Sequence, residues 1–290
     1  METIKPEKYP CATIYKIRHN EIKKFDLVHC AEPAETLEHF YARQTEKPDI
    51  LCNGGFFDML TGNTVFTYSD DGSIISIDNT LLEGITIVNN RPVLTFFEEG
   101  MGDFISAYPV FMKKGSIVNT NVASDINYRA QRTILGFDDI FTYLIFIEKI
   151  SKTEVGYNFS EIKQLLIDYT IPNAINLDGG GSTRCLYKGE KKIGQAYSRP
   201  VDNVVAIYLK DPVIYRVQTG AFSNRQNAEN YKKKIQSLPD NIGAGYKNAY
   251  IRLIDGVYKV QVGAFSVKLN AEKVLADLRE KGYNGFITIK

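Results

Sequence analysis

An internal repeat near the C-terminus constrains the fold more than any other feature of the sequence. The segment YRVQTGAF begins at Tyr215, and the similar segment YKVQVGAF begins at Tyr258. Each copy opens with alternating apolar and polar residues, which is typical of a strand with one buried face. Gly220 and Gly263 then predict a turn after each strand. The end of the chain is therefore expected to repeat one strand-and-helix unit twice.

Helical spacing of apolar residues follows each copy of the repeat. Ser223 and Ser266 are the predicted N-caps of these two helices, and Gly282 is a predicted left-handed C-cap. Further strands over residues 250–254 and 286–289 complete the order β-α-β-β-α-β, a ferredoxin-like layout with both helices on one face of the sheet. The other face would then carry four polar side chains: Arg216, Gln218, Lys259 and Gln261.

The V-Q-x-G-A-F repeat resembles the SPOR domain over about residues 212–290. The resemblance implies a module that binds peptidoglycan glycan strands on its exposed sheet face, with Gln218 and Lys259 at the positions of a binding glutamine and a basic residue. This chain departs from the family in having no tryptophan, and Val257 stands where some members have an aromatic residue. The pattern alone also allows a solvated sheet face. An RNA-binding sheet would need exposed aromatic residues on its central strands, where this chain has Gln, Arg and Lys.

The first 210 residues contain many short β patterns. Helical patterns cover residues 35–44 and 160–169, the second with Ser160 as its expected N-cap. We therefore predict an α+β protein, with a strand-rich mixed α/β catalytic domain over residues 1–210 and a small domain over 212–290. Charge supports this division, because the last 79 residues hold 13 Lys and Arg against 6 Asp and Glu, whereas the rest is acidic. The expected strands of the first domain are 13–17, 50–52, 74–77, 85–88, 133–137, 141–147 and 174–177.

The segment NLDGGGSTR, residues 176–184, concentrates polar groups and glycines directly after a predicted strand. Glycines let a ligand approach the backbone, successive amides can bind an anion, and a guanidinium suits phosphate. Taken alone, an Asp-Gly-Gly stretch is more often a simple turn. However, CNGGFFD at 52–58 repeats the arrangement, and RAQRTILGF at 129–137 places Arg129 and Arg132 just before a strand.

These three segments together resemble the phosphodiester glycosidase family over most of residues 10–210. The matching motifs are N-G-G-F-F-D at 53–58, R-T-x-x-G at 132–136 and N-L-D-G-G-G-S-T at 176–183, while Gln131 stands where the family often has glycine. The resemblance implies cleavage between the anomeric carbon of a sugar and a phosphodiester, such as a GlcNAc-1-phosphodiester. Because a phosphodiester leaves readily without a proton, stabilisation of charge matters more than general-acid catalysis.

On this resemblance we assign the catalytic residues. Asp178 is the expected nucleophile or base, and Arg132 and Arg184 are the expected phosphate clamps. Asn53 and Asn176 are expected to bind sugar hydroxyls or to orient Asp178. Asp58 is the second choice of carboxylate; either aspartate could instead be a turn residue, and the arginines could form surface ion pairs. Phe56 and Phe57 are expected in the core or a pocket wall. The expected substrate-binding residues are Asn176, Gly179, Gly180, Gly181, Ser182, Thr183, Arg184, Gly54, Gly55 and Arg199.

The cysteine and histidine positions argue against a metal site. Cys11, Cys30, Cys52 and Cys185 form no C-x-x-C pair, so free packing thiols are expected, with one disulfide left open. The three histidines are ten residues apart, which does not suit a metal site or a Ser-His-Asp triad. We therefore predict no cofactor and no metal, while calcium or magnesium beside a phosphate stays open although no loop has ordered ligand spacing.

The combined prediction is a hydrolase that acts at the cell wall or outside the cell. Its basic domain would tether it to peptidoglycan and raise the local concentration of a sugar-phosphate substrate. No apolar run approaches the roughly 20 residues of a membrane span, and no signal peptide is seen. A phage-encoded protein released by lysis, or a form without its leader, would fit. The alternatives are a glycoside hydrolase without phosphate specificity, a non-catalytic wall-binding protein, and a nucleic-acid binder, which we do not favour.

Overall fold

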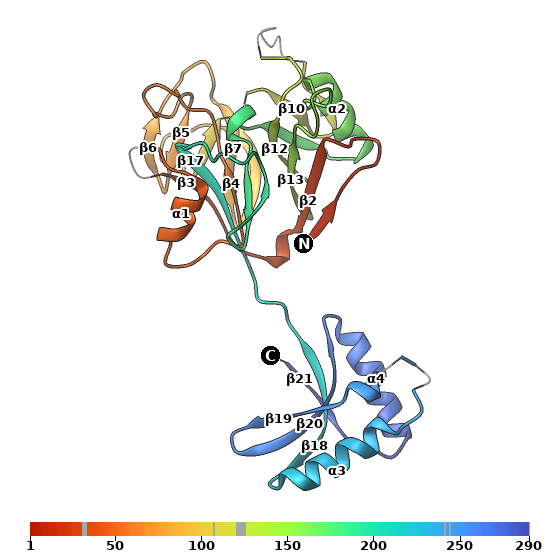
Figure 1. Ribbon diagram of the computed structural model, residues 1–290. Helices are drawn as coiled ribbons and strands as arrows, with labels where there is room; N and C mark the ends of the chain where they lie inside the picture. Colours follow the sequence, from red (N-terminus) through yellow and green to blue (C-terminus); the bar gives the residue numbers. More distant parts are fainter. Residues whose placement is uncertain (31–33, 107, 120–125, 241, 244, 290) are drawn as a thin grey trace. The chain divides into compact units, whose positions relative to one another are not determined.

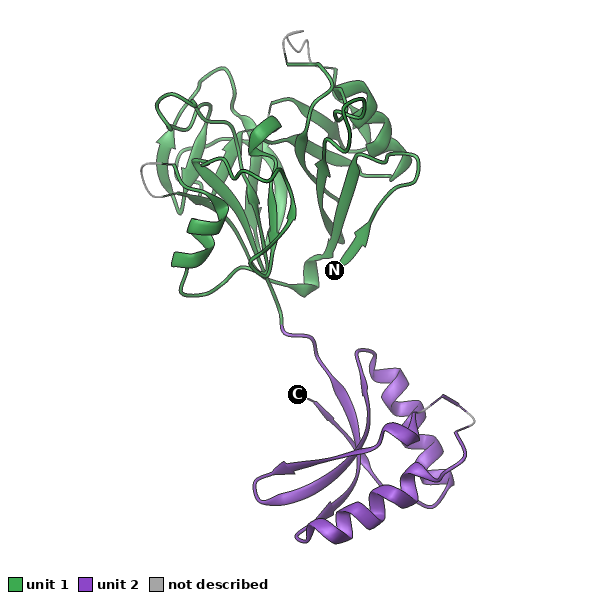
Figure 2. Ribbon diagram, in the orientation of Figure 1, with its two compact units in different colours: residues 1–210 green, residues 211–290 purple. Residues whose placement is uncertain are grey.

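The computed structural model describes residues 1–290 except 31–33, 107, 120–125, 241, 244 and 290 (Figure 1). The chain divides into two compact units, residues 1–210 and 211–290 (Figure 2). Both units combine helices with antiparallel sheets. The predicted α+β class is therefore confirmed. Among the described residues, no helix is long and apolar enough to cross a membrane.

Three antiparallel sheets form the first unit. The seven-stranded sheet has the order β1 (Glu2–Ile4), β2 (Ala12–Arg18), β13 (Phe141–Ile147), β12 (Arg132–Phe137), β14 (Asn173–Asn176), β10 (Val110–Lys113) and β11 (Ser116–Ile117). A five-stranded sheet has the order β16 (Glu190–Ile193), β15 (Cys185–Tyr187), β4 (Ile50–Asn53), β17 (Asn203–Leu209) and β3 (Ile22–His29). The second five-stranded sheet has the order β6 (Ser73–Ser76), β5 (Tyr68–Asp70), β9 (Phe104–Ser106), β7 (Glu83–Val88) and β8 (Arg91–Phe96).

Alternation along the central strands places apolar residues on both faces of the first two sheets. In β12, Leu135 packs into a core shared by the two sheets, whereas Ile134 packs under helix α2 (Phe159–Asp168). In β4, Cys52 belongs to the shared core and Leu51 packs under helix α1 (Leu37–Arg43). The two sheets therefore form a sandwich with one helix on each outer face (Figure 1). Burial on both faces explains why these strands read as continuous apolar runs.

The helix N-caps of the first unit follow the physical rule but not always the predicted residue. Thr36 caps α1 by accepting from the amide of His39. Asn158, not Ser160, caps α2, and Glu161 returns the interaction in a capping box. The predicted cap was wrong because the helix begins at Phe159, so Asn158, two residues before Ser160, is in position for its Oδ1 to accept from the amide of Glu161 at 2.9 Å.

Side chains from the second five-stranded sheet cover the open edge of β3. The amides of Phe25, Leu27 and His29 donate to Asn90 Oδ1, Asp103 Oδ2 and Asp70 Oδ2 at 3.1, 3.1 and 2.8 Å. An uncovered edge would present unpaired backbone groups to other chains. These bonds fix the third sheet against the sandwich.

The second unit is a four-stranded sheet with two helices. Its elements are β18 (Tyr215–Phe222), α3 (Arg225–Gln236), β19 (Tyr250–Ile254), β20 (Val257–Phe265), α4 (Lys268–Glu280) and β21 (Phe286–Ile289), and the strand order is β19-β20-β18-β21. Short 3-10 helices occur at His19–Glu21 (η1), Gly180–Ser182 (η2) and Tyr246–Asn248 (η3).

Two local predictions for this unit were wrong. Gly220 and Gly263 do not end the strands; the pairing of β18 with β20 shifts register at Gly220, and Gly263 lies at φ +67° inside β20. Such irregularities insert a residue without ending a strand. Asn224 caps α3, and Val267 precedes α4 without a side-chain cap, so the two serines are not the caps. Gly282 has the expected left-handed φ, +83°.

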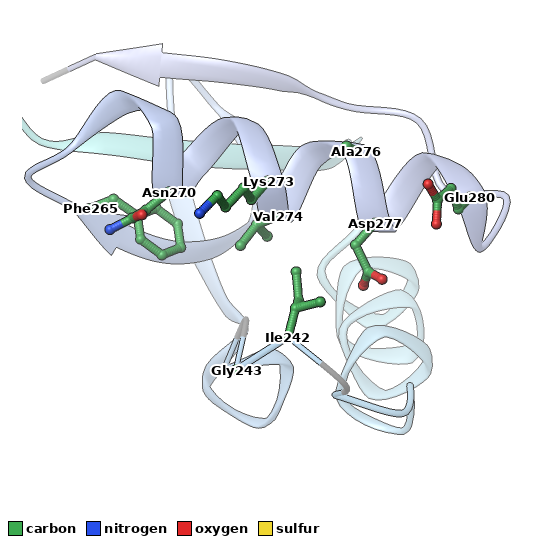
Figure 3. Close-up of a pocket in the computed structure, with 9 residues that line it drawn as sticks. All are labelled: Ile242, Gly243, Phe265, Asn270, Lys273, Val274, Ala276, Asp277 and Glu280. Carbon is green, nitrogen blue, oxygen red and sulfur yellow. The ribbon is translucent and has the colours of Figure 1, made fainter.

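The two sides of this sheet carry different chemistry. Val217 and Val262 pack against the helices, and a cavity of about 540 Å³ lies on that side along α4, between Phe265, Lys273 and Ile242 (Figure 3). Gln218 and Gln261 are direct cross-strand partners. They are only 6% and 2% exposed, so the centre of the polar face is less open than expected.

Candidate active site

The three sequence motifs meet where strands of both sandwich sheets begin or end. β4 ends at Asn53 and β14 ends at Asn176, while β12 begins at Arg132 and β15 begins at Cys185. The glycine-rich segment between β14 and β15, residues 177–184, therefore crosses from one sheet to the other, and we call it the crossing. Close packing explains its composition, because a Cβ on Gly179 would lie 2.7 Å from the carbonyl oxygen of Gln131.

Asp178 is the central carboxylate of this crossing. Its amide donates to Gly54 O at 3.0 Å, and its Oδ1 accepts from the amide of Gly179 at 2.8 Å. Burial raises the pKa of Asp178 to about 6, although Ser182, Gly179 and the charges of Arg199 and Arg132 act in the opposite direction. A carboxyl group with such a pKa can exchange a proton near neutral pH.

Asn53 joins three elements around Asp178. Its Nδ2 donates to the carbonyl of Asp178 at 2.7 Å, and its Oδ1 accepts from Thr133 Oγ1 at 2.8 Å and from the amide of Arg184 at 3.2 Å. The side chain is fully buried. Of the two roles predicted for Asn53, this geometry matches the orientation of Asp178 and leaves the amide oxygen no capacity for a sugar hydroxyl.

Arg132 is a buried cation without an ion pair among the described residues. It is 7% exposed, and its Nη2 donates to Ile126 O and Tyr128 O at 2.6 and 2.9 Å. Its Nε has no hydrogen-bond partner in the part of the chain that the structure describes. Burial lowers its pKa, while the charge of Asp178 opposes that shift. A buried guanidinium without an ion pair favours the binding of an anion next to it.

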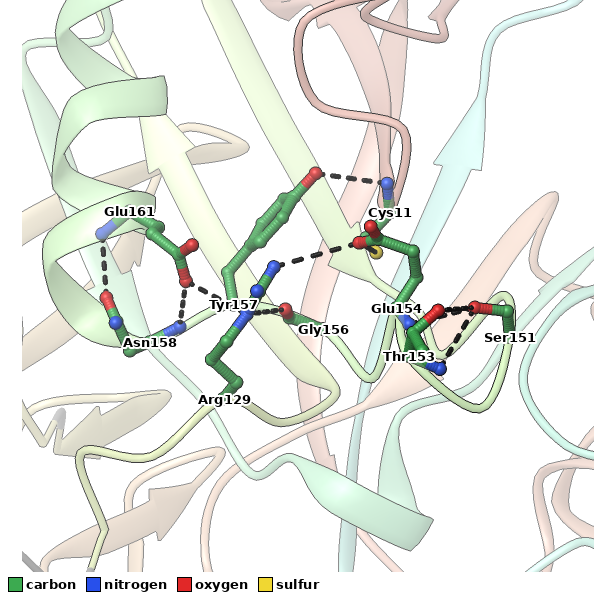
Figure 4. Close-up of polar contacts among 9 residues, drawn as sticks. All are labelled: Cys11, Arg129, Ser151, Thr153, Glu154, Gly156, Tyr157, Asn158 and Glu161. Atoms are coloured by element: carbon green, nitrogen blue, oxygen red, sulfur yellow. Dashed lines mark hydrogen bonds and ion pairs between the residues drawn. The ribbon is translucent and has the colours of Figure 1, made fainter.

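Arg129, which precedes Arg132 by three residues, has a structural environment instead. Its Nε donates to Gly156 O at 2.9 Å, and its guanidinium lies 3.7 and 3.4 Å from Glu154 and Glu161 (Figure 4). The neighbouring Tyr157 hydroxyl accepts from the amide of Cys11. Arg129 is therefore tied to the first turn of α2 through Glu161.

Arg199 is the second arginine at the site. A Cβ built on Gly181 would lie 2.5 to 2.9 Å from three atoms of its guanidinium, so this group lies directly over the glycine. Arg199 is partly exposed, and its charge lowers the pKa of Asp178. Glycine at 181 thus allows the guanidinium to approach the crossing segment closely.

Buried polar atoms without partners concentrate at this crossing. In native proteins most buried polar atoms are hydrogen-bonded, so each exception needs a water molecule, a ligand or another explanation. The Ser182 hydroxyl lowers the pKa of Asp178, although no hydrogen bond of normal geometry joins the two side chains. Among the described residues six such side-chain atoms occur, and four belong to the site: Arg132 Nε, Asn176 Oδ1, Ser182 Oγ and Thr183 Oγ1.

Arg184 and Asp58 have structural environments that differ from their expected roles. The Arg184 guanidinium pairs with Glu38 and donates to Gln195 O at 2.8 Å, so its nitrogens are directed to protein acceptors. Asp58 is exposed, and its Oδ1 accepts from the amides of Leu60 and Thr61. These backbone bonds hold the pKa of Asp58 below its usual value. Asp58 is therefore placed as the turn residue that the sequence also allowed.

Gly54 and Gly55 are packed closely against Asn203. A Cβ on Gly54 would lie 2.1 Å from Asn203 Oδ1, and the amide of Gly55 donates to the same oxygen at 2.6 Å. In contrast, Gly180 adopts φ +57°, and a Cβ built on it would have no described atom within 4 Å. Its amide donates to Gln131 O.

Two supporting residues were missed by the sequence reasoning. Thr133 donates to Asn53, and its place in the R-T motif could have indicated this role. Glu38 neutralises Arg184 from α1, and no local signal in the sequence indicates a partner so far along the chain.

The described residues contain no group of three His, Cys, Asp or Glu side chains that could hold a metal ion. All four cysteines are free and buried. Burial raises the pKa of each of these thiols, so they are unreactive packing groups.

Comparisons with known proteins agree with the two-unit structure. Residues 46–208 match the phosphodiester glycosidase family, and residues 211–289 match the SPOR domain. The chain is 25% identical over 164 residues to the mouse (Mus musculus) N-acetylglucosamine-1-phosphodiester alpha-N-acetylglucosaminidase. That match covers 48% of this chain and 32% of the relative, so the chain spans about a third of the curated relative's length.

Solved structures share the fold of the first unit. The zebrafish N-acetylglucosamine-1-phosphodiester alpha-N-acetylglucosaminidase catalytic domain, auto-inhibited by its pro-peptide, has a TM-score of 0.54 and 18% identity over 72% of this chain and 88% of its own. A hypothetical protein from Synechocystis has a TM-score of 0.58 and 11% identity over 72% of this chain and 61% of its own. The family match covers more than half of the chain and contains the whole crossing around Asp178. This chain is therefore a member of the phosphodiester glycosidase family that also carries a C-terminal SPOR domain.

Proposed function

We propose that the first unit hydrolyses a sugar-1-phosphodiester of the GlcNAc-1-phosphodiester type. The observation that carries this proposal is the arrangement of one carboxylate and two arginines. Asp178, whose pKa is raised to about 6, lies within the electrostatic influence of Arg132 and Arg199. Neither arginine forms an ion pair among the described residues.

The chemistry of the substrate fits this arrangement. The leaving phosphodiester carries its negative charge without needing a proton, and guanidinium groups stabilise it as the bond to the anomeric carbon breaks. Asp178 then acts on the positively charged anomeric centre as a nucleophile, or as a base that activates water. Asn53 positions the Asp178 backbone and does not touch the substrate.

The pH dependence of turnover tests this function. With the methyl diester of GlcNAc-1-phosphate as substrate, kcat/KM is expected to rise about tenfold per pH unit up to about pH 6 and then level off, because Asp178 must be ionised. Arg199→Gln should shift this limb to higher pH, since the charge of Arg199 lowers the pKa of Asp178.

Asp178→Asn is expected to lose at least about 1,000-fold in kcat if the carboxylate reacts directly. Asp58→Asn is the matched control, because Asp58 is an exposed turn residue and should keep near-native turnover. Equal loss in the two variants, or hydrolysis of a plain GlcNAc disaccharide as fast as that of the phosphodiester, would contradict the proposal.

The second unit is proposed to anchor the enzyme to peptidoglycan glycan strands. Its strand order supports a ferredoxin-like topology with one face free of helices. Gln218 and Gln261 lie at the centre of that face, and Gln261 Oε1 is a buried acceptor without a partner among the residues described for this unit. Arg216 and Lys259 lie on the same two strands and give the face positive charge. A cell-wall site of action follows from this anchoring.

A further inference from the structure

The rings of Phe56, Phe66 and Tyr108 form an aromatic row on the opposite side of Asp178 from Arg132. The sheet order is β12-β14-β10, so the strand that leads to Asp178 has Arg132 on one neighbour and Tyr108, just before β10, on the other. Asn176 Nδ2 donates to Tyr108 O at 3.0 Å, and the amide of Asp178 donates to Gly54 O at 3.0 Å, two residues before Phe56. The Phe56 and Phe66 rings are 5.4 Å apart, and the Phe66 and Tyr108 rings are 6.2 Å apart.

Phe66 is held in an unfavourable backbone conformation at the centre of this row. Its φ is +71°, which a bulky side chain rarely adopts. The loop that precedes it closes on itself, because Val65 donates to Phe56 O at 3.1 Å and Phe57 pairs with Thr64. Phe56, Phe66 and Tyr108 all stay partly exposed, so full burial in the core does not explain the strain. Strain of this kind concentrates at ligand sites, where the surrounding structure fixes a side chain for contact.

A cavity of about 370 Å³ continues from the row at Tyr108 and Pro109. Its other walls include Leu81, Leu82 and Phe96. Its described lining residues include no lysine or arginine, and their one carboxylate, Glu83, pairs with Lys113. A mostly apolar cavity of this size with a few polar groups suits an uncharged ligand. It does not suit the phosphate end of a substrate, which the arginines on the other side would hold.

Resting on the function proposed above, we infer that the aromatic row binds the reacting sugar and that the adjacent cavity binds a second sugar attached to it. The aromatic rings offer flat apolar surfaces against which the C–H face of a pyranose packs. Asp178 then stands between the sugar and its phosphate, as cleavage at the anomeric carbon requires. The substrate class is an oligosaccharide-1-phosphodiester, so the enzyme cleaves behind a glycan of at least two sugars, not behind a single terminal sugar.

Two synthetic substrates test this inference: the methyl diesters of GlcNAc-1-phosphate and of N,N′-diacetylchitobiose-1-phosphate. The wild-type enzyme should show a kcat/KM at least about tenfold higher for the disaccharide, which corresponds to one modest extra contact. Leu82→Trp fills the cavity and should remove this preference by lowering kcat/KM for the disaccharide substrate to about that for the monosaccharide substrate. Phe66→Ala should raise KM for both substrates about tenfold with a smaller effect on kcat.

Phe96→Ala is a second cavity variant and should reduce the preference while enlarging the space, which guards against a folding defect of the tryptophan variant. Leu60→Ala is the matched control, because Leu60 is 97% exposed in the same loop as the row. Equal kcat/KM for the two substrates in the wild type would overturn this inference while leaving the phosphodiesterase function intact. If neither substrate is cleaved, the proposed function and this inference both fail.

Discussion

At the scale of single residues, the burial that raises the pKa of Asp178 also lowers the stability of the folded protein when Asp178 is ionised. Its pKa is about 6 in the folded chain and near 3.8 when exposed, so the folded state disfavours the ionised form. The stability of the wild type should therefore fall as pH rises from about 4 to about 6 and stay lower above that range. Asp178→Asn removes the charge and should be more stable than the wild type at pH 7.5, by on the order of 1–3 kcal/mol, but not at pH 4.

Urea unfolding of both proteins at the two pH values measures this difference. Asp58→Asn should change the stability at pH 7.5 in the opposite direction and make the protein less stable than the wild type. Backbone hydrogen bonds lower the pKa of Asp58, so its negative charge stabilises the folded state, and this contribution is fully present only above its ordinary pKa. An Asp178→Asn variant that is less stable than the wild type at pH 7.5 would show that the carboxylate has a structural role.

Asn53 is expected to matter for stability and for turnover together. Asn53→Ala leaves the Asp178 carbonyl, the Thr133 hydroxyl and the Arg184 amide without a partner in a fully buried place. We expect a loss of about 2–4 kcal/mol in the free energy of unfolding and a lower kcat with little change in KM. Asn63→Ala, at an exposed position of the neighbouring loop, should change neither. An active, fully stable Asn53→Ala protein would contradict the role of Asn53 in positioning Asp178.

The residue types at the site could be predicted from the sequence, but their division into chemical and structural roles could not. Arg132 and Arg184 look equivalent in their motifs. Glu38 neutralises Arg184 from 146 positions away, whereas Arg132 donates to two carbonyl oxygens and lies over the Tyr128 and Phe159 rings. Such a partner is set by the meeting of α1 with the start of β15, which is a property of the assembled sheets. Ion pairing across that distance leaves no periodic trace in the sequence.

At the scale of elements, two glycines of the site should respond differently to alanine. In Gly54→Ala the new Cβ meets Asn203 Oδ1 at 2.1 Å and the Asn203 backbone at 3.1 and 3.2 Å, so β4 or β17 must shift. We expect a loss of about 1–3 kcal/mol. In Gly181→Ala the three atoms nearest the Cβ all belong to the guanidinium of Arg199, which is the flexible end of a side chain. Stability should change by less than about 0.5 kcal/mol, while kcat/KM falls because Arg199 moves.

Thermal unfolding and kinetics of both variants, together with Arg199→Ala, separate the two effects. The Gly181→Ala and Arg199→Ala losses should not add in the double variant, since both remove the same guanidinium from the site. Additive losses would mean that Gly181 acts through something other than Arg199.

The positions of strands were predictable where the apolar pattern was continuous, as over residues 141–147, which agree with β13. Pairing was not predictable. β4 lies between β15 and β17, whose residues are more than 130 positions away, and local sequence does not encode such partners. The bulges of β18 and β20 were also missed, because a glycine after an alternating run signals a turn and a bulge equally well.

At the scale of the whole molecule, the two proposed activities are assigned to two units that differ in the sign of their net charge. The repeat and the charge balance could indicate this division from the sequence alone, since they depend on composition and not on long-range contacts. What the sequence could not indicate is that Gln218 and Gln261 are nearly buried side by side. Burial follows from their position on the two central strands.

Anchoring is expected to depend on this glutamine pair and not on charge alone. In the full chain, Gln261→Ala should reduce binding to purified peptidoglycan about tenfold, because it removes a buried acceptor at the centre of the face. Turnover of a small soluble phosphodiester should not change, since the substitution lies in the other unit. Gln226→Ala, on the exposed surface of α3, is the matched control and should bind as the wild type does. Binding that falls steeply with salt and is competed by an oligonucleotide would instead identify a nucleic-acid surface. Retention of full affinity by Gln261→Ala would place the glycan contact elsewhere on the unit.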